Sequence, residues 1–180
     1  MPKMIRLPAR AEKAADALLS DGWREIETLE TWSAVLHDGL GIRRAAAGDM
    51  PAVEKIARQV FKHDRLHSDP AVDDAEADKF KAGLVRSAFA WPHKTVYVHG
   101  KPIDGFLIVR FPDGDMVIDL IGVKEESRGQ DIARRLIQGA RTLAGPHAIT
   151  AGTQSTNEAA KRLYQSIGMK IVKRERTFHK

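Results

Sequence analysis

The sequence predicts an α/β protein built as one domain, and three observations lead to this fold class. The chain has 180 residues, an ordinary size for a single domain with a sizeable core. Predicted helices alternate with predicted strands along the chain, instead of standing in separate blocks. The β-forming run over residues 116–123 leads through a glycine turn into a helix over 132–144, with apolar residues in near-helical register.

The first half of the chain begins with a helix whose end is marked by Gly22, since glycine commonly follows a helix. The next residues are rich in Trp, Ile, Thr and Val and are expected to be extended. Asp49 is expected to cap a helix that tolerates Pro51 in its first turn. The predicted elements are a helix over 10–21, an extended segment over 23–36, a strand over 40–44, a helix from 49 to about 61, a polar loop over 62–72 and a helix from 73 to about 89.

The second half changes to shorter, β-rich segments separated by glycine and proline turns, typical of strands. Strands are predicted over 95–98, 103–111, 116–123, 148–151 and 170–178, with helices ending at 144 and spanning 156–167. From residue 41 the predicted order is therefore β-α-α-β-β-β-α-β-α-β. Residues 1–40 are expected to form a helix–strand extension that packs on a main domain over 41–180.

The composition excludes several classes of protein. Apolar residues make up 43% and charged residues 29%, and no apolar run is long enough to span a bilayer. The residues from Met1 to Pro8 lack the apolar region of a signal peptide, so a cytoplasmic location is expected. The absence of cysteine excludes disulfides, thiolate zinc sites and cysteine nucleophiles.

The charge is compatible with an anionic partner but does not identify one. The net charge is +5 and the pI is about 9.6. Aromatic residues make up only 6% of the chain and do not alternate with basic residues, so nothing in the sequence suggests a base-stacking platform for nucleic acid. Neither nucleic acid nor a membrane is an expected partner.

The turn at Arg128 and Gly129 has the features of a phosphate site. A strand, a basic glycine turn and a helix start together present unpaired backbone N–H groups and a positive helix end to an anion. The spacing from Arg128 to Ala133 resembles the R-x-x-G-x-G/A signature of the GCN5-related N-acetyltransferases, or GNAT superfamily, with Asp131 in place of the middle glycine.

Two further segments strengthen the resemblance. Residues 157–169 resemble the family's N-x-x-A-x-x-x-Y-x-x-x-G-F motif. Residues 64–70 (DRLHSDP) and 118–121 (IDLI) resemble segments of the branch that acetylates nucleotide-linked amino sugars, such as dTDP-fucosamine acetyltransferase. The resemblance implies the acyl-CoA N-acyltransferase fold, a mixed central sheet flanked by helices. It also implies acetyl transfer from acetyl-CoA, as co-substrate, to a primary amine in a ternary complex.

The resemblance also implies where acetyl-CoA binds. The backbone of the third strand pairs with the pantetheine arm at a bulge that splays two strands, with Gly122 at a position of close approach. The turn then holds the pyrophosphate. Arg134 and Arg135 are long enough to reach phosphates, but the favoured interpretation is that they are solvated helix residues. The implied cofactor-binding residues are Ile121, Gly122, Val123, Arg128, Gly129, Gln130, Asp131, Ile132, Ala133, Asn157 and Tyr164.

Asp131 leaves two alternatives open. If its carboxylate faces the diphosphate, repulsion of the order of 1 kcal/mol at about 4 Å in water, and a few times that near a surface, costs one to three decades of affinity. If it turns outward, it stabilises the positive start of the helix. A chain that has kept the fold and lost acetyl-CoA binding, acting as an acyl-CoA-sensing or partner-binding domain, is the non-enzyme alternative.

Two residues are candidates for the chemistry. Tyr164 is expected to protonate the departing coenzyme A thiolate, the alternative being a buried structural tyrosine. Asp119, expected on one strand face with Val117 and Ile121, is a candidate to help the amine lose its proton, the alternative being an exposed strand residue. Asn157 is expected to hold pantetheine or an ordered water, or simply to cap its helix.

The predicted loop before the second helix lies on the acceptor side in the family. Arg65, His67 and Asp69 are therefore candidates to bind sugar hydroxyls or nucleotide phosphate. His63 and His67 are four residues apart, but no third conventional ligand accompanies them, so no metal site is expected. The preferred acceptor is a nucleotide-linked amino sugar. Another small amine or a protein amine is the alternative, and a homodimer paired through edge strands is one expectation.

Overall fold

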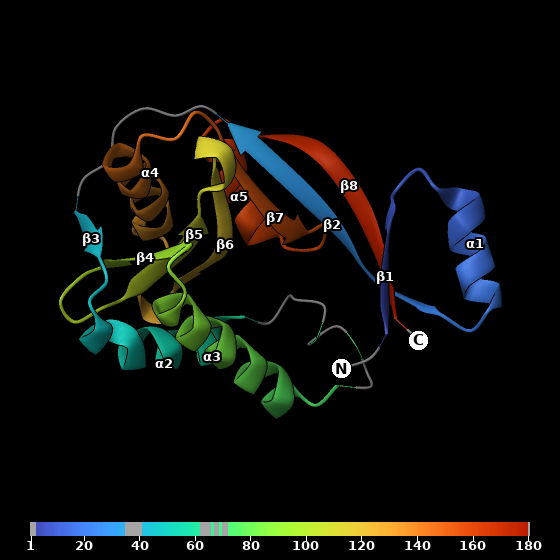
Figure 1. Cartoon of the computed structure of the whole chain (residues 1–180), viewed down its shortest axis with the longest axis horizontal. Coiled ribbons are helices and arrows are strands. Elements are labelled where there is room, and N and C mark those ends of the chain that lie inside the picture. The colour runs from blue at the N-terminus through green and yellow to red at the C-terminus, as the bar shows by residue number, and fades with distance from the viewer. Residues whose placement is uncertain (1–2, 35–40, 62–65, 67–68, 70–71, 180) are drawn as a thin grey trace.

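The structure is a computed structural model that describes residues 3–34, 41–61, 66, 69 and 72–179 (Figure 1). Helices and strands are interspersed along the chain as the sequence predicts, and short 3-10 turns form some of the connections. The helices are α1 Glu12–Ser20, α2 Met50–Val60, α3 Asp74–Ala90, α4 Ile132–Ala144 and α5 Glu158–Ser166. The strands are β1 Met4–Pro8, β2 Arg24–Ala34, β3 Ile42–Arg44, β4 Lys94–His99, β5 Gly105–Arg110, β6 Met116–Val123, β7 Ile149–Gln154 and β8 Lys170–His179.

One mixed sheet runs through the molecule. In the described residues it has eight strands in the order β1-β8-β2-β7-β6-β5-β4-β3. Neighbouring strands are antiparallel except β6 and β7, which are parallel and are connected through α4. A parallel pair needs such a crossover, because the chain must return to the same end of the sheet. The α/β class with a mixed, helix-flanked sheet is therefore confirmed.

Helices cover both faces of the sheet. α4 and α5 lie on one face and pack on a core centred on Leu107, Met116 and Leu136, all inaccessible to solvent (Figure 1). α2 and α3 lie on the other face and pack on a core that includes Ile56 and Phe106. Strands buried on both faces are nearly continuous apolar runs, as in β5, where only its last residue is exposed.

The start of α2 differs from the prediction, because Asp49 does not cap it. Asp73 caps α3 as expected, accepting a hydrogen bond from the Ala75 N–H at 2.8 Å. Asp49 precedes α2 but makes no side-chain cap to it. Its carboxylate instead binds the Arg43 guanidinium through two hydrogen bonds of 2.6 and 2.9 Å and accepts the Ala46 N–H. The stronger charge-assisted pair with Arg43 therefore takes the place of the expected cap.

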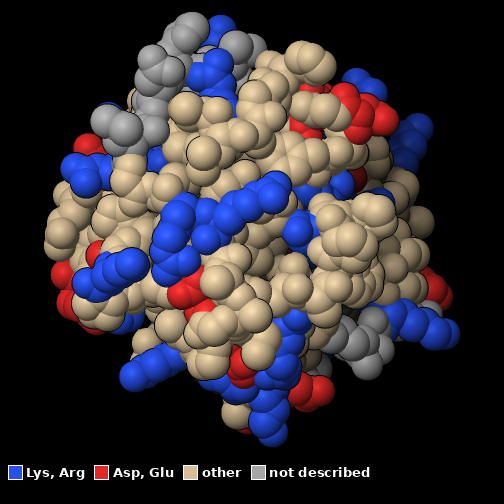
Figure 2. All heavy atoms as spheres, turned by 60° about the vertical axis from the view of Figure 1, so that its left-hand side comes forward, with Lys and Arg blue, Asp and Glu red and all other residues tan. Residues whose placement is uncertain are grey.

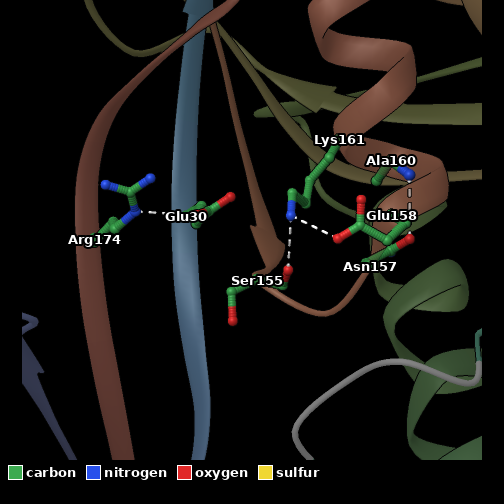
Figure 3. Close-up of polar contacts among 7 residues, drawn as sticks. All are labelled: Glu30, Ser155, Asn157, Glu158, Ala160, Lys161 and Arg174. Atoms are coloured by element: carbon green, nitrogen blue, oxygen red, sulfur yellow. Dashed lines mark hydrogen bonds and ion pairs between the residues drawn. The ribbon is translucent and has the colours of Figure 1, made fainter.

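The N-terminal residues contribute two strands to the sheet. β2 lies between β7 and β8, and β1 pairs with the other edge of β8. The ion pair between Glu30 of β2 and Arg174 of β8, 3.0 Å long, adds a side-chain link (Figure 3). The sequence analysis expected the strand over 23–36 but missed β1, whose five residues are too short for a clear alternating pattern. The domain boundary at residue 40 stays a prediction.

Among the described residues, no helix combines the length and apolar character needed to cross a bilayer.

Candidate active site

The parallel strands β6 and β7 pair only over their first residues. Met116, Val117 and Ile118 lie opposite residues 149–151, and pairing stops there. β6 continues to Val123 bonded to β5, while β7 continues to Gln154 bonded to β2. The facing edges of the two strands therefore diverge. Backbone N–H and C=O groups on such an edge need hydrogen-bond partners, which an extended ligand with amide groups supplies.

A cleft of about 560 Å³ occupies this opening, a size typical of small-molecule sites. It is bordered by β6, β7, the first turns of α4 and α5, and Val60, Phe61 and Lys81 from the α2–α3 side. Most of the residues predicted to bind acetyl-CoA line it: Ile121, Gly122, Val123, Arg128, Gly129, Asp131, Ile132, Ala133, Asn157 and Tyr164. Gln130, also described by the structure, is exposed and is not part of this lining.

The turn before α4 presents its backbone to the cleft. Gly129 has a φ of +76°, a conformation that glycine adopts without steric cost. Within the described part of the chain, the backbone N–H groups of residues 129–134 have no hydrogen-bond acceptor. Several donors and the positive end of α4 thus converge on one place, which is the arrangement that binds phosphate groups.

Asp131 precedes α4 in the left-handed conformation, with φ +59° and ψ 12°. This explains why the resembling signature has glycine here, because most residues with a Cβ are strained at positive φ, and Asp is among the few that tolerate it. The Asp131 side chain is 64% exposed, and its Oδ1 lies 3.8 Å from Arg134 Nε. The carboxylate therefore lies at the open rim of the cleft beside a compensating cation.

Arg134 contributes to the site, although the sequence analysis interpreted it as a solvated residue. It lines the cleft, and its Nε is buried without a hydrogen-bond partner among the described residues. An unpaired buried donor costs free energy unless a ligand or water accepts its hydrogen bond. Its neighbour Arg135 is exposed and does not line the cleft. Arg134 and Arg135 are adjacent in the same helix, and of the two Arg134 lies beside the cleft. Helical spacing in the sequence does not show which of them lies there.

Gly122 is required by packing on the α2 face of β6. A Cβ at this position would lie 2.7 Å from Phe106 Cε1 and 2.9 Å from Val60 Cγ2. Phe106 is fully buried and cannot move aside. The structure therefore explains this glycine by the packing of protein side chains, and its close approach to pantetheine stays a prediction.

Asp119 lies in a β-bulge. Ile108 of β5 is opposite Leu120 and Val109 is opposite Ile118, so Asp119 is the extra residue of β6. The expectation that Val117, Asp119 and Ile121 share one face is wrong, since the bulge reverses the side-chain alternation. The Asp119 carboxylate is half-buried and is held by Lys94 Nζ at 2.8 Å and Arg110 Nε at 2.9 Å. It lines the cleft at the point where β6 leaves β7.

Tyr164 lies in the buried part of the cleft wall. Its side chain projects from α5 and is 2% exposed. Burial raises the pKa of the Tyr164 hydroxyl above its ordinary value near 10, because the apolar surroundings disfavour the phenolate. The phenol is therefore neutral at physiological pH and keeps its O–H proton.

The start of α5 is fixed by a small polar cluster (Figure 3). Asn157 Oδ1 accepts the Ala160 N–H at 3.1 Å, which makes Asn157 the helix cap. Lys161 Nζ binds the Ser155 carbonyl at 3.1 Å and the Glu158 carboxylate at 2.7 Å (Figure 3). Asn157 also lines the cleft, so a structural and a ligand-binding role are compatible in one side chain.

The loop residues predicted on the acceptor side are only partly described. Arg65 and His67 lie outside the described residues, as do His63 and Asp64. Asp69 is 1% exposed, and its carboxylate faces Arg24 of β2 at 3.2 Å. It does not line the cleft. No group of three or more His, Cys, Asp or Glu side chains suited to a metal ion occurs in the described part of the chain.

Comparison with known proteins now adds to this geometry. Residues 92–170, which include β6, the turn, α4 and α5, match the family model described as acetyltransferase (GNAT) domain. This part of the chain is similar to GNAT acetyltransferase domains, and the match covers less than half of the chain. The matched segment contains β6, the turn before α4 and Tyr164, so the predicted resemblance is confirmed for the segment that forms most of the cleft.

Several of the proteins to which this chain is similar are longer than the chain. It is 29% identical over 128 residues to the spore coat polysaccharide biosynthesis protein SpsD of Bacillus subtilis (strain 168). That match covers 67% of the chain but 44% of SpsD, so the chain spans less than half the length of this curated relative.

Solved structures share the fold. The GCN5-related N-acetyltransferases of Sphaerobacter thermophilus and Kribbella flavida are 18% and 14% identical, with TM-scores of 0.65 and 0.62. They match 99% and 98% of this chain and 60% and 67% of their own. AAC(6')-Iy, solved with the bisubstrate analog CoA-S-monomethyl-acetylneamine, has a TM-score of 0.51 at 16% identity, over 71% of this chain and 88% of its own. The chain therefore has the GNAT fold.

Proposed function

We propose that the protein is an acetyl-CoA-dependent N-acetyltransferase that transfers the acetyl group directly to a primary amine of a small molecule. One observation carries the proposal: β6 and β7 diverge into a cleft that ends at a turn whose N–H groups have no acceptor among the described residues. The strand edges suit the amides of pantetheine, and the turn suits the pyrophosphate. Arg128 and Arg134 add positive charge beside that turn.

The reaction forms one bond and breaks another. The amine nitrogen attacks the thioester carbonyl carbon, the C–N bond forms, and the C–S bond breaks with its electron pair going to sulfur. Tyr164 is the proposed donor to that sulfur. Because an ordinary thiol has a pKa of about 8.5 and burial raises the pKa of Tyr164, complete proton transfer from the phenol is uphill. Its role is therefore to stabilise the thiolate by a hydrogen bond, acting mainly in the transition state.

The amine must also lose a proton. Asp119 lies where β6 leaves β7, and a water between the amine and its carboxylate would relay that proton. Both Asp119 oxygens already face a cation, Lys94 on one side and Arg110 on the other. Protonation of Asp119, directly or through water, would disrupt one of these pairs. The proposed role of Asp119 is therefore to hold the water that takes the proton from the amine and passes it on to solvent.

The proposed acceptor is a nucleotide-linked amino sugar. SpsD takes part in spore coat polysaccharide biosynthesis, as its name states, and residues 64–70 resemble the amino-sugar branch. The basic surface supports an anionic acceptor, since Lys and Arg side chains adjoin across the face that carries α2, β3 and α4 (Figure 2). A cytoplasmic location and a homodimer formed through the edge strands β1 and β3 are further proposals that rest on the sequence and on the sheet order.

A second candidate function is a non-catalytic acyl-CoA-sensing domain, and Asp131 is the residue that favours it. A carboxylate stands at a position where the family has glycine, at the rim of the proposed pyrophosphate site. This candidate predicts acetyl-CoA binding, or loss of it, without turnover of any amine.

The first test is calorimetric titration with acetyl-CoA at low salt, followed by initial rates with uridine- and thymidine-diphosphate amino sugars, free amino sugars and peptides. Micromolar binding and faster turnover of a nucleotide-linked amine are expected. Arg134→Gln should weaken acetyl-CoA binding about tenfold, as expected for one charge-assisted contact, and Arg135→Gln on the same helix is the matched control. No binding up to millimolar acetyl-CoA would refute the proposal, and binding without turnover would favour the sensing domain.

A further inference from the structure

A second hollow lies beside the acetyl-CoA cleft, next to the C-terminal end of α3 and against β4, β5 and β6. Its volume is about 420 Å³. Ile108 and Leu120 form its apolar floor, and its rim carries four side chains of different chemistry: Trp91, Lys94, Arg110 and Asp119. The size lies in the range of small-molecule sites, which combine apolar surface with a few placed polar groups.

The hollow meets the cleft at the β6 bulge. Asp119 and Leu120 line both spaces. Asp119 is also the residue at which β6 separates from β7, and therefore the place where the proposed function puts the reacting thioester. A molecule held in the hollow can extend past Asp119 into the cleft and bring an amine to that thioester.

The charges of the hollow favour an anion. One carboxylate, Asp119, lies between two cations, Lys94 at 2.8 Å and Arg110 at 2.9 Å, so this group has a net charge of about +1. Arg110 binds Asp119 through Nε, and its side chain is 48% exposed. Its two Nη groups have no partner among the described residues. Guanidinium donors of this kind suit a phosphate oxygen pair.

Trp91 adds a stacking surface. Its side chain is 59% exposed although it is large and aromatic, and its ring centroid lies 6.0 Å from Lys94 Nζ. An exposed indole beside cations is a surface on which a nucleobase stacks while its phosphates meet the positive charge. The exposed ring is therefore a candidate stacking surface for a base.

We propose that this hollow binds the nucleoside diphosphate part of the acceptor. The base stacks on Trp91, the diphosphate lies against Arg110 and Lys94, and the attached amino sugar extends past Asp119 into the cleft. The inference rests on the proposed function, because it assigns the acceptor side of the same site. It also gives Lys94 and Arg110 a role in substrate specificity beyond holding Asp119.

The test measures binding of thymidine diphosphate and uridine diphosphate by calorimetry, in protein first saturated with coenzyme A. Saturation matters because a diphosphate would otherwise also bind the turn before α4. One of the two diphosphates should bind. Uridine and thymidine, which lack phosphate, and inorganic pyrophosphate, which lacks a base, should each bind at least tenfold more weakly.

Variants separate this inference from the proposed function. Trp91→Ala and Arg110→Gln should each weaken diphosphate binding about tenfold or more, since base stacking is worth roughly 1–3 kcal/mol. Trp91→Phe should retain most of the affinity, and all three should keep the affinity for acetyl-CoA. Arg128→Gln, in the turn, should weaken acetyl-CoA and leave the diphosphate unchanged.

Two outcomes would overturn the inference: no diphosphate binding to protein saturated with coenzyme A, or binding by Trp91→Ala as tight as that of the wild type. Strong binding of a free amino sugar that depends on Trp91 but not on Arg110 would also overturn it, in favour of sugar stacking. Acetyl-CoA binding by the same protein preparation reports on the proposed function separately. Its absence would refute that function, and the diphosphate titration would then be repeated in Arg128→Gln protein.

Discussion

Tyr164 is a buried residue of the cleft, and its proposed role is to stabilise the departing thiolate by a hydrogen bond. Tyr164→Phe removes one hydroxyl and little else. The rate at saturating acetyl-CoA should fall by about 10²-fold, as expected when an acid–base group is lost, while the dissociation constant of acetyl-CoA stays unchanged. Steady-state rates and calorimetry measure the two quantities.

The pH dependence of the rate gives a second check on Tyr164. Because burial raises the pKa of the phenol, its ionisation should cause no loss of activity up to about pH 10. A Tyr164→Phe rate equal to the wild-type rate would remove Tyr164 from the mechanism, even if the variant folds normally.

Asp131 combines a charge effect with a backbone effect, and two substitutions separate them. Asp131→Asn removes the charge and keeps a residue that tolerates the left-handed conformation. Asp131→Gly removes the charge and relieves the conformation. Both should tighten acetyl-CoA binding about fivefold, since repulsion at a largely exposed position is about 1 kcal/mol.

Thermal unfolding and calorimetry compare the Asp131 variants. Glycine should change stability by less than about 1 kcal/mol, because the strain relieved is offset by the entropy that it adds to the unfolded chain. Equal acetyl-CoA affinity in wild type and Asp131→Asn would mean that the carboxylate points away from the diphosphate.

At the scale of elements, the shape of β6 depends on two residues. Gly122 leaves room for packed side chains, and Asp119 forms the bulge. Gly122→Ala should destabilise the protein by about 1–3 kcal/mol, because the new methyl group overlaps Phe106 and Val60. Gly83→Ala in α3 is the matched control. It meets no atom within 4 Å and should stabilise the helix by about 0.5–1 kcal/mol.

Denaturant unfolding measures both glycine variants. A Gly122→Ala protein as stable as wild type would show that Phe106 or β6 moves aside, and acetyl-CoA binding would then test whether the cleft has changed shape.

The sequence predicted most elements because helix caps, glycine ends and β-forming runs are local properties. The whole of β6, Met116–Val123, was predicted with its observed bounds. The bulge at Asp119 was not predicted, because one extra residue does not change the composition of the strand. It nevertheless moves the side chains that follow to the opposite face of the sheet.

The candidate site shows the same limit. The phosphate turn follows from contiguous residues and was predictable. For Arg134 the solvated role was favoured over phosphate contact, because the sequence does not show that its Nε is buried. The hollow around Trp91 was missed, since it unites residues of α3, β4, β5 and β6. Arg65 and His67 stay predictions.

At the scale of the whole molecule, several carboxylates paired with arginines set the response to acid. Hydrogen bonds from Arg43 lower the pKa of Asp49 to about 2, and Arg176 and Arg58 lower the pKa values of Glu25 and Glu54. Their contribution to stability is therefore present above their ordinary values near 4 and is lost as the pH falls below 4 towards 2.

Denaturant unfolding at pH 7, 5 and 3 should show a loss of stability confined to the lowest step, and added salt should reduce it because these ion pairs are partly exposed. Asp49→Asn should make the acid dependence shallower. A stability that falls mainly between pH 7 and 5 would point to other groups.

The position of β2 between β7 and β8 has a consequence for how the chain assembles. Residues 24–34 are synthesised early, but their strand partners, residues 149–154 and 170–179, emerge more than a hundred residues later. Until then β2 has two unsatisfied edges, the condition in which a nascent strand pairs with the wrong neighbour or with another chain. The long sequence separation of these contacts also favours slow folding. The early strand is therefore the part of this molecule with the greatest need of a chaperone during synthesis.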